Sequence, residues 1–358
     1  MRVLFDMTHP AHVHFFKNVI RLLVERGHEV QIAARPKEMT TDLLDALGLP
    51  YVCLSHPSSG LLGMGMELAV RNWRMLALAR RFRPDVLVGA AGVSVGPVGA
   101  LLGIPRLVLE DAEHARLQRM IGLPLATRIL TGLGYFKDLG KRQVPCRAVL
   151  NQAYLDPPYF QPNAEPLRRA GVDPDEPYIV LRLVSWQAAH DFGLHGAGNE
   201  EVHRIVERLS RHHRVFISSE RPLPAAPKSY ESPVPVQHMH DLLAFAALYI
   251  GEGGTMAAEA AILGIPAIFC NPLRTGYLSA LEKSYGLVHN TNSLAEGVEI
   301  AERWLNQPEL KAEWQHKRRR LLDDTEDVNR FLYGLIEEAA GHRRGARPAP
   351  RRPPPPAP

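Results

Sequence analysis

The chain has 358 residues, of which 46% are hydrophobic and 22% are charged. This composition excludes a wholly disordered or fibrous protein. Because a single core rarely extends past about 250–300 residues, we expect two domains. The net charge of +4 arises at the C-terminal end, where residues 342–358 hold five arginines and no acid. Since the rest of the chain is close to neutral, we expect no nucleic-acid partner.

The cysteines and the apolar segments indicate an intracellular globular protein. Cys53, Cys146 and Cys270 lie far apart, a pattern typical of small buried residues rather than of a disulfide framework or a zinc site. Residues 1–6 run directly into a strand-like segment without a secretory leader, so we expect a cytoplasmic protein. Residues 86–105 carry no charge, but their glycines and prolines favour a strand, a turn and a short helix over a membrane span.

Apolar strands and amphipathic helices alternate through residues 1–155. Strands are predicted at 2–6, 28–34, 51–54, 85–90 and 106–109. Helices are predicted at 13–26, 40–48 and 66–82. Strands separated by helices indicate parallel βαβ units, so this region is predicted to be a Rossmann-like, doubly wound domain.

Residues 156–177 hold six prolines and are predicted to form a linker. The alternation resumes in residues 178–325, which we expect to be a second Rossmann-like domain. Strands are predicted at 178–184, 214–219, 248–251 and 266–270, with helices at 199–211, 239–247 and 255–264. A C-terminal helix is predicted at 326–341 and a disordered tail at 342–358. The two α/β domains would face a cleft, into which the carboxyl ends of their strands would point.

The segment GEGGTMAAEAAILGIP begins at Gly251, where a strand is predicted to end. Glycines let a backbone approach a ligand closely, and the free N–H groups at the start of a helix attract anions. Gly253, Gly254 and Thr255 are therefore candidates for holding a diphosphate, with Thr255 as the helix cap. Glu259 lies one turn further along the same face, where its carboxylate could accept both hydroxyls of a ribose. This hypothesis requires a pocket that is open towards the cleft.

Three histidines follow the first strand, His9, His12 and His14. The dipole at a helix N-terminus disfavours a protonated imidazole, so a histidine there is suited to accept a proton near neutral pH. We expect His12 to be the general base, with His9 and His14 near the acceptor. Capping or packing roles for His12 and His14 stay open. No carboxylate accompanies these histidines at the spacing of metal ligands, so no metal site is expected.

The loop after the first strand of the second domain carries further candidates. Ser185 could donate to a phosphate, and Trp186 could stack on a ring or pack in the core. His190 and Asp191 are candidate catalytic residues that polarise or position a reacting group.

Two further strand ends carry carboxylates. Ser219 and Glu220 are expected to flank the nucleotide base, because they end a strand of the second domain. Glu110 ends a strand of the first domain and is a candidate acid at the acceptor site.

The GEGG segment resembles the nucleotide-binding signature of two-domain glycosyltransferases of the GT-B fold. It is similar to that region of the peptidoglycan N-acetylglucosaminyltransferase and of the non-hydrolysing UDP-N-acetylglucosamine 2-epimerase. From about residue 1 to 335 the chain most closely resembles the domain of unknown function 354 family. The sequence segments that carry this resemblance are HPAHVHFFKN, LRLVSWQAAHD, RVFISSE and GTMAAEAAILGIPAIF. The resemblance implies a GT-B-like fold and places His12 where the transferase has its candidate base. It also implies that residues 178–325 bind a nucleotide sugar and that residues 1–155 bind the acceptor.

These features predict an enzyme that transfers a sugar from a nucleotide-activated donor, UDP-linked, to a sugar or lipid-linked acceptor without a metal ion or another cofactor. The alternative is a nucleotide-sugar 2-epimerase, in which a glutamate at the place of Glu110 serves the catalytic site. Two departures favour transfer over epimerisation, since an acidic position of the epimerase falls in the loop 89–92, GAAG, and its histidine is replaced by Gln187. A non-catalytic nucleotide-sugar-binding protein of a polysaccharide pathway is a third hypothesis. Peripheral attachment to a membrane stays open.

Overall fold

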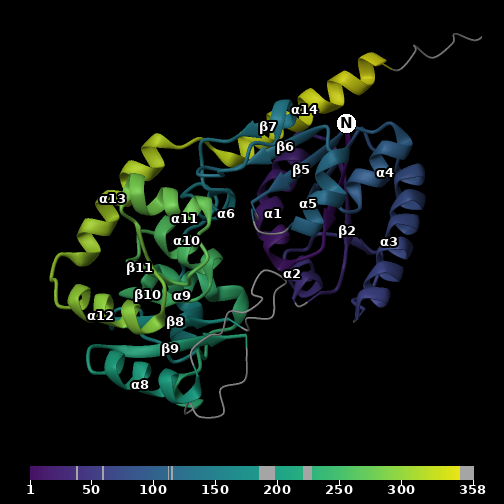
Figure 1. Cartoon of the computed structure of the whole chain (residues 1–358). Coiled ribbons are helices and arrows are strands. Elements are labelled where there is room, and N and C mark those ends of the chain that lie inside the picture. Colours follow the sequence, from purple (N-terminus) through teal and green to yellow (C-terminus); the bar gives the residue numbers. More distant parts are fainter. Residues whose placement is uncertain are drawn as a thin grey trace, which may run out of the picture.

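The computed structural model of the chain describes residues 1–37, 39–58, 60–111, 113, 116–184, 198–220 and 228–346. Its strands form two parallel sheets, each covered by helices, with the linker between them (Figure 1). The α/β class and the parallel pairing predicted from the alternation of strands and helices are confirmed.

The first sheet has seven strands in the order β3-β2-β1-β4-β5-β6-β7. Its strands are β1 (Arg2–Met7), β2 (Glu29–Ala34), β3 (Tyr51–Cys53), β4 (Val86–Ala90), β5 (Arg106–Glu110), β6 (Arg128–Thr131) and β7 (Gln143–Pro145). The helices of this half are α1 (Pro10–Glu25), α2 (Thr40–Ala46), α3 (Gly60–Phe82), α4 (Val95–Leu102), α5 (Arg116–Gly122) and α6 (Gln152–Leu155). The strand order reverses between β1 and β4, which in such sheets is where ligands bind.

The second sheet has five strands in the order β12-β11-β10-β8-β9. Its strands are β8 (Tyr178–Leu183), β9 (Arg214–Ser219), β10 (Leu248–Gly251), β11 (Ala267–Cys270) and β12 (Val288–Thr291). The helices that follow α6 are α7 (Glu165–Arg169), α8 (Asn199–Ser210), α9 (Met239–Phe245), α10 (Gly254–Ile262), α11 (Gly276–Ala280), α12 (Leu294–Leu305) and α13 (Leu310–Asp324). The order reverses between β8 and β10, so the turn after β10 lies at a second switch point.

The last helix, α14 (Val328–Ala346), returns to the first domain and packs against α1 (Figure 1). Leu332 and Ile336 are buried in the core that also holds α1, and Asn329 Nδ2 donates to the Ala153 carbonyl at 2.7 Å. The helix runs past residue 341, where the sequence predicts its end, to Ala346. The chain thus crosses between the two domains twice, at the linker and before α14.

The uncharged segment 86–105 forms β4, a turn and α4, as the glycines and prolines predict. Helix α3 begins at Gly60, six residues before the predicted start at 66. Its early glycines are poor helix formers, which hid this start from the sequence pattern. In the described part of the chain, no helix has both the length and the hydrophobicity needed to cross a membrane.

Candidate active site between the two sheets

The turn between β10 and α10 lies at the switch point of the second sheet. Gly253 is the N-cap of α10 in an extended conformation, and the helix begins at Gly254. Thr255 was expected to be the cap, but it is the second residue of the helix, and its side chain is exposed. A glycine cap without a side-chain partner leaves the first N–H groups of the helix available to an anion.

This turn is fitted closely to its neighbours. A Cβ atom at Gly251 would lie 2.5 Å from the carbonyl oxygen of Arg182, so β10 could not hold a side chain there without moving. Glu252 is buried, and its Oε2 accepts a hydrogen bond from the Val184 N–H at 3.1 Å. The carboxylate of Glu252 therefore joins the end of β8 to the turn and is a structural group.

Arg182, which sequence reasoning missed, lies near the end of β8 beside this turn. Its guanidinium donates to Ser218 Oγ at 2.7 Å and forms an ion pair with Glu220. Ser219 is the last residue of β9, so both residues expected to flank the base do lie at the carboxyl edge of the sheet. The pairing of Glu220 with Arg182 gives this carboxylate a partner within the protein.

Glu259 lies on the buried side of α10, between the two domains. Its Oε1 accepts a hydrogen bond from the Tyr154 hydroxyl of α6 at 2.7 Å and lies 3.2 Å from Nε2 of His240 in α9. The ring of His14 in α1 packs edge-on against His240, with 4.9 Å between centroids. Burial alone would raise the pKa of Glu259, but His240 and the Tyr154 hydroxyl together lower it below its ordinary value. We call these four residues the interdomain cluster.

The interdomain cluster covers most of Glu259, so a ribose can reach its carboxylate only where these partners leave it accessible. Glu259 is only 7% exposed, and its partners Tyr154 and His240 come from different domains. Both contacts involve Oε1, so a ribose would have to approach through Oε2 or displace Tyr154. His14, expected near the acceptor, belongs to this cluster instead.

The first turn of α1 fixes His9 and His12 by hydrogen bonds. His9 is the N-cap of α1, and its Nδ1 accepts from the Ala11 N–H at 3.2 Å. His12 Nδ1 accepts from the Thr8 N–H at 3.2 Å, so its proton resides on Nε2. Burial, together with His9 and nearby cations, lowers the pKa of His12 to about 3. Held in this way, His12 is a neutral hydrogen-bond donor and a weak base.

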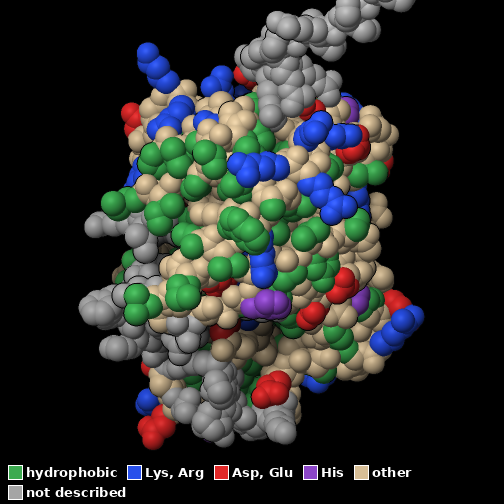
Figure 2. Space-filling view, turned by 90° about the vertical axis from the view of Figure 1, so that its right-hand side faces the viewer, with side chains coloured by type: hydrophobic (Ala, Val, Ile, Leu, Met, Phe, Trp, Pro, Cys, Tyr) green, Lys and Arg blue, Asp and Glu red, His purple; other side chains and the backbone are tan. Residues whose placement is uncertain are grey.

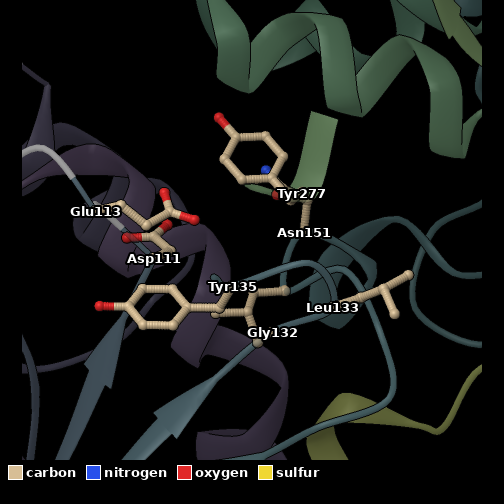
Figure 3. Close-up of a pocket in the computed structure, with 8 residues that line it drawn as sticks. Asp111, Glu113, Gly132, Leu133, Tyr135, Asn151 and Tyr277 are labelled. Atoms are coloured by element: carbon tan, nitrogen blue, oxygen red, sulfur yellow. The ribbon is translucent and has the colours of Figure 1, made fainter. Parts of the chain in front are cut away.

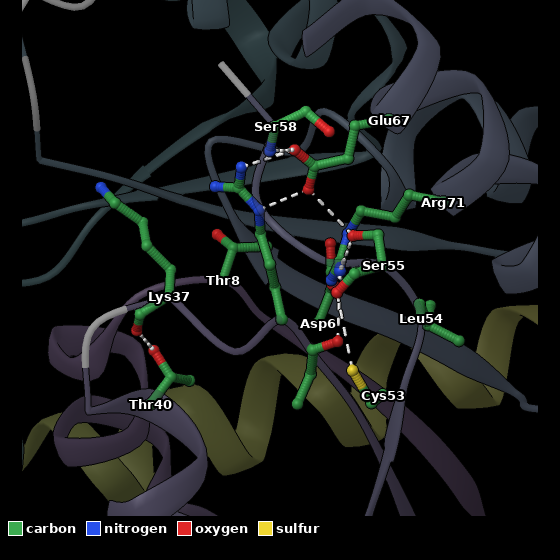
Figure 4. Close-up of polar contacts among 12 residues, drawn as sticks. Asp6, Thr8, Lys37, Thr40, Cys53, Leu54, Ser55, Ser58, Glu67 and Arg71 are labelled. Carbon is green, nitrogen blue, oxygen red and sulfur yellow. Dashed lines mark hydrogen bonds and ion pairs between the residues drawn. The ribbon is translucent and has the colours of Figure 1, made fainter. Parts of the chain in front are cut away.

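A buried ionic network supports the same edge of the first sheet (Figure 4). Arg71 of α3 pairs with Asp6 at the end of β1, and it also donates to Ser55 Oγ at 3.3 Å. Arg35, just after β2, holds Glu67 with two hydrogen bonds of 2.5 and 2.7 Å. Glu67 has partners on both of its carboxylate oxygens, so its ion pair with Arg35 holds this edge of the sheet in place.

The loop after β5 faces the second domain across a small cavity. Asp111 and Glu113 line one side, and Tyr277 of α11 lines the other (Figure 3). Glu113 Oε1 accepts from the Gly276 N–H at 3.1 Å, so the loop is joined directly to α11. Glu110, the expected acid, is buried at the end of β5 and does not line this cavity. Asp111 is the carboxylate at its mouth.

Four of the expected site residues, Ser185, Trp186, His190 and Asp191, lie outside the described residues, as does Gln187. Their assigned roles stay predictions. Among the described residues there is no group of three or more histidine, cysteine or acidic side chains placed to hold a metal ion.

Comparison with known proteins assigns the chain to a family. The chain belongs to the family described as protein of unknown function DUF354, which matches residues 1–340. An uncharacterized protein of Methanocaldococcus jannaschii is 25% identical over 312 residues, covering 83% of this chain and 89% of that protein. The UDP-N-acetylglucosamine–N-acetylmuramyl-(pentapeptide) pyrophosphoryl-undecaprenol N-acetylglucosamine transferase of Tolumonas auensis is 31% identical over 117 residues. That match spans 30% of this chain and 32% of the transferase.

Solved structures show the same two-domain fold. A UDP complex of MnaA from S. aureus superposes with a TM-score of 0.70 at 10% identity, over 95% of this chain and 97% of that one. The UDP-GlcNAc 2-epimerase of M. jannaschii gives 0.63 at 15% identity, over 89% and 99%. The Streptomyces sp. SF2575 glycosyltransferase SsfS6 with thymidine diphosphate gives 0.61 at 15% identity, over 94% and 99%. The chain therefore has the GT-B fold, as its sequence motifs imply.

Proposed function

We propose that this protein binds a nucleotide-activated sugar, UDP-linked, and transfers the sugar to a hydroxyl group of a sugar or lipid-linked acceptor. The observation that carries the proposal is the glycine-capped start of α10 at the switch point of the second sheet. It lies next to the cavity that the first domain lines with Asp111 and Glu113. The UDP and thymidine diphosphate complexes of proteins with this fold support a nucleoside diphosphate as the ligand.

In this proposal the start of α10 holds the diphosphate. The N–H groups of Gly254 and Thr255 and the Thr255 hydroxyl donate to its oxygens, and Gly253 lets them approach. The same groups stabilise the negative charge that appears on the diphosphate as the sugar leaves, so no metal ion is needed. Glu259 accepts from the ribose through Oε2. His12 donates from Nε2, in place of the role as base that its sequence position suggests. The acceptor oxygen bonds to the anomeric carbon as the bond from that carbon to the diphosphate breaks, and the proton of the acceptor hydroxyl passes to the departing diphosphate.

A ligand panel with Glu259→Ala tests the nucleotide site. We expect UDP and UDP-sugars to raise the thermal stability of the parent protein, by about 2.7 kcal/mol at a ligand concentration of 100 Kd. Glu259→Ala should weaken UDP binding by about tenfold or more, because the carboxylate that accepts a hydrogen bond from the ribose is lost. Glu299→Ala, at an exposed glutamate of α12, is the matched control. Equal UDP affinity for the Glu259 variant and the parent would reject this assignment.

Epimerisation is the second candidate, and the two carboxylates at one cavity favour it, since a proton must leave and return at one carbon. The two reactions differ in their need for an acceptor. Incubation with UDP-N-acetylglucosamine alone, followed by NMR, yields a new sugar isomer for an epimerase and none for a transferase. A protein that binds the nucleotide sugar and yields no product with any acceptor would instead be a binding protein.

We further propose that the first domain rests on a membrane surface when the acceptor is lipid-linked. Large apolar side chains are exposed on three helices that pack side by side, namely Leu62 and Trp73 of α3, Leu101 of α4 and Met120 of α5. Figure 2 shows apolar side chains spread over the face on which α3 and α4 lie, with lysines and arginines among them. An apolar patch with basic side chains suits an anionic bilayer surface.

Sedimentation with vesicles tests this surface. The parent protein should sediment with vesicles that contain phosphatidylglycerol and less with neutral vesicles, because the basic side chains favour anionic lipid. Trp73→Glu should release the protein from the vesicles, since it places a charge among the apolar side chains that contact the bilayer. Val236→Glu, at an exposed apolar residue of the second domain, is the control. Equal sedimentation of both variants would reject the surface.

A further inference from the structure

The cavity of Figure 3 is built by both domains. Asp111, Glu113 and Tyr135 come from loops after β5 and β6, Asn151 precedes α6, and Tyr277 comes from α11. The cavity volume is about 10 Å³, which is room for about one water molecule. A site of this kind, lined from both sides of a cleft, has walls that separate if the domains move apart.

The cavity lies beside the first turn of α10. A Cβ atom at Gly254 would lie 3.0 Å from the Tyr277 hydroxyl, so this phenol lies directly between the first turn of α10 and the cavity. On another side, Asn151 Nδ2 donates to the Tyr154 hydroxyl at 2.7 Å, and Tyr154 donates to Glu259. The cavity therefore adjoins the groups that would hold the diphosphate and the ribose, and whatever is joined to the diphosphate would enter it.

The lining is rich in groups that pair with hydroxyls. The Tyr135 hydroxyl is buried and has no hydrogen-bond partner within the described residues. The phenol of Tyr277, the amide of Asn151 and the carboxylate of Asp111 add donors and acceptors at other points of the wall. A buried hydroxyl without a partner is destabilising, so a ligand that supplies hydroxyl groups would gain affinity here.

The charge of the cavity restricts which sugar can enter. Among the described charged groups that act on the Tyr135 phenol, Glu110, Asp111 and Glu113 are carboxylates, and Arg119 is the one cation. Arg119 Nη1 donates to the backbone carbonyl of Glu113 at 3.1 Å, which ties it to the same loop. Asp111 is exposed at the mouth of this space, where its carboxylate meets an incoming group. A second carboxylate brought into this space would be repelled.

We propose that this cavity is the subsite for the sugar of the donor, and that it accepts neutral hexoses and N-acetylhexosamines and excludes uronic acids. Tyr135 and Tyr277 hold the sugar hydroxyls, and Asp111 sets the charge preference. The inference rests on the proposed function, because it takes the start of α10 to be the diphosphate site. Asp111 and Tyr277 face each other from different domains, so a sugar fits between them once these domains separate.

Calorimetric titration of the full chain with four probes tests the subsite, namely UDP, UDP-glucose, UDP-N-acetylglucosamine and UDP-glucuronic acid. We expect the better of the two neutral donors to bind more tightly than UDP, and UDP-glucuronic acid to bind at least about tenfold more weakly than that donor. Tyr277→Phe and Tyr135→Phe should each reduce the advantage of the neutral donor over UDP by about 2- to 10-fold, with UDP affinity unchanged. Tyr51→Phe, at a tyrosine paired with Asp45 far along the first sheet, is the control.

Asp111→Asn isolates the charge preference, because the amide keeps the size of the side chain. This variant should reduce the difference in affinity between UDP-glucuronic acid and the neutral donor by several-fold. The subsite is wrong if UDP binds but UDP-glucuronic acid and the neutral donor bind equally well. It is also wrong if Asp111→Asn and the tyrosine variants leave the affinity differences unaltered. In both cases the assignment of the nucleotide site is retained. If none of the four probes binds the parent protein, the proposed function fails and the subsite with it.

Discussion

At the residue scale, several charged and titratable side chains of this protein are buried, and their partners decide what they do. Asp6 and Arg71 are both almost fully buried and paired. Taking either partner away leaves the other charge without compensation in a poorly polarisable interior. Histidines at the same edge stay neutral because burial disfavours the charged ring. Loss of an ion-pair partner and acidification of the buried histidines should therefore both destabilise the folded protein, and both effects can be measured.

Replacement of Arg71 by alanine should lower the free energy of unfolding by about 3–5 kcal/mol, because Asp6 is left buried without its partner. The double variant Asp6→Asn with Arg71→Met should lose less than Arg71→Ala alone. Glu29→Ala removes an exposed ion pair with Arg2 and should cost at most about 1 kcal/mol. Urea unfolding measures all three, and a loss under 1 kcal/mol for Arg71→Ala would contradict the network.

The pH dependence of stability should report His14. Burial, the neighbouring His240 and Lys17 lower the pKa of His14 from 6.5 to about 3. Below pH 6.5 the unfolded chain therefore binds a proton that the folded chain does not, so the free energy of unfolding falls as the pH falls from 6.5 towards 3, by up to about 1.4 kcal/mol per unit. His14→Phe keeps a ring against Tyr154 and should reduce this slope, while His12, whose pKa is lowered to a similar value, keeps its own contribution.

Urea unfolding at pH 7 and pH 5.5 measures the difference. His203→Gln, at a histidine whose side chain is 48% exposed, serves as control and should keep the parent slope. A slope that is the same in His14→Phe and the parent would show that His14 is accessible to protons in the folded protein.

At the element scale, the turn from β10 into α10 depends on its glycines. The Cβ of Gly251→Ala would lie 2.5 Å from the Arg182 carbonyl oxygen, a distance that the backbone of β8 or β10 must relieve by moving. We expect Gly251→Ala to lower the free energy of unfolding by about 1–3 kcal/mol and to weaken UDP binding, because the first turn of α10 shifts with the strand.

Gly334 in α14 provides the opposite case. Nothing lies within 4 Å of a Cβ placed there, and the position is an exposed helix interior, so Gly334→Ala should raise stability by up to about 1 kcal/mol. Thermal and urea unfolding of both variants test the pair. If Gly251→Ala were as stable as the parent and bound UDP equally well, the close fit of the turn would not matter.

At the scale of the whole molecule, the two domains are joined by the interdomain cluster and by the contact between Gly134 and Gly276. A Cβ on Gly276 would lie 2.1 Å from the carbonyl oxygen of Gly134, so the two backbones are in direct contact beside the cavity. These contacts keep the cleft closed around a space of about one water molecule. A nucleotide sugar therefore competes with contacts that the domains make to each other.

This competition predicts that loss of a contact between the domains raises the affinity for UDP. Tyr154→Phe removes the hydroxyl that occupies Oε1 of Glu259, so UDP affinity should rise several-fold if Glu259 binds the ribose. Tyr159→Phe removes an equivalent bond, to Asp327, away from the cluster and should leave UDP affinity unchanged. Titration calorimetry measures both variants. Weaker UDP binding by Tyr154→Phe would mean that Tyr154 supports the ligand rather than excludes it.

The sequence by itself determined the alternation of strands and helices, the parallel sheets and the glycine turn before α10, because these depend on local periodicity and on residues a few positions apart. It missed β6, β7 and β12, which are three or four residues long and too short to show a period. It also placed Thr255 as the cap of α10, where the backbone makes Gly253 the cap.

Only the tertiary structure decided which partners the candidate residues have. Glu259 meets Tyr154 from 105 positions away, and Asp111 faces Tyr277 across the cleft. The Thr8 N–H donates to His12 Nδ1, which leaves the ring proton on Nε2. Such pairings depend on how two separately folded sheets pack against each other, and that packing is set by many weak apolar contacts along the whole chain. No local pattern in the sequence encodes it.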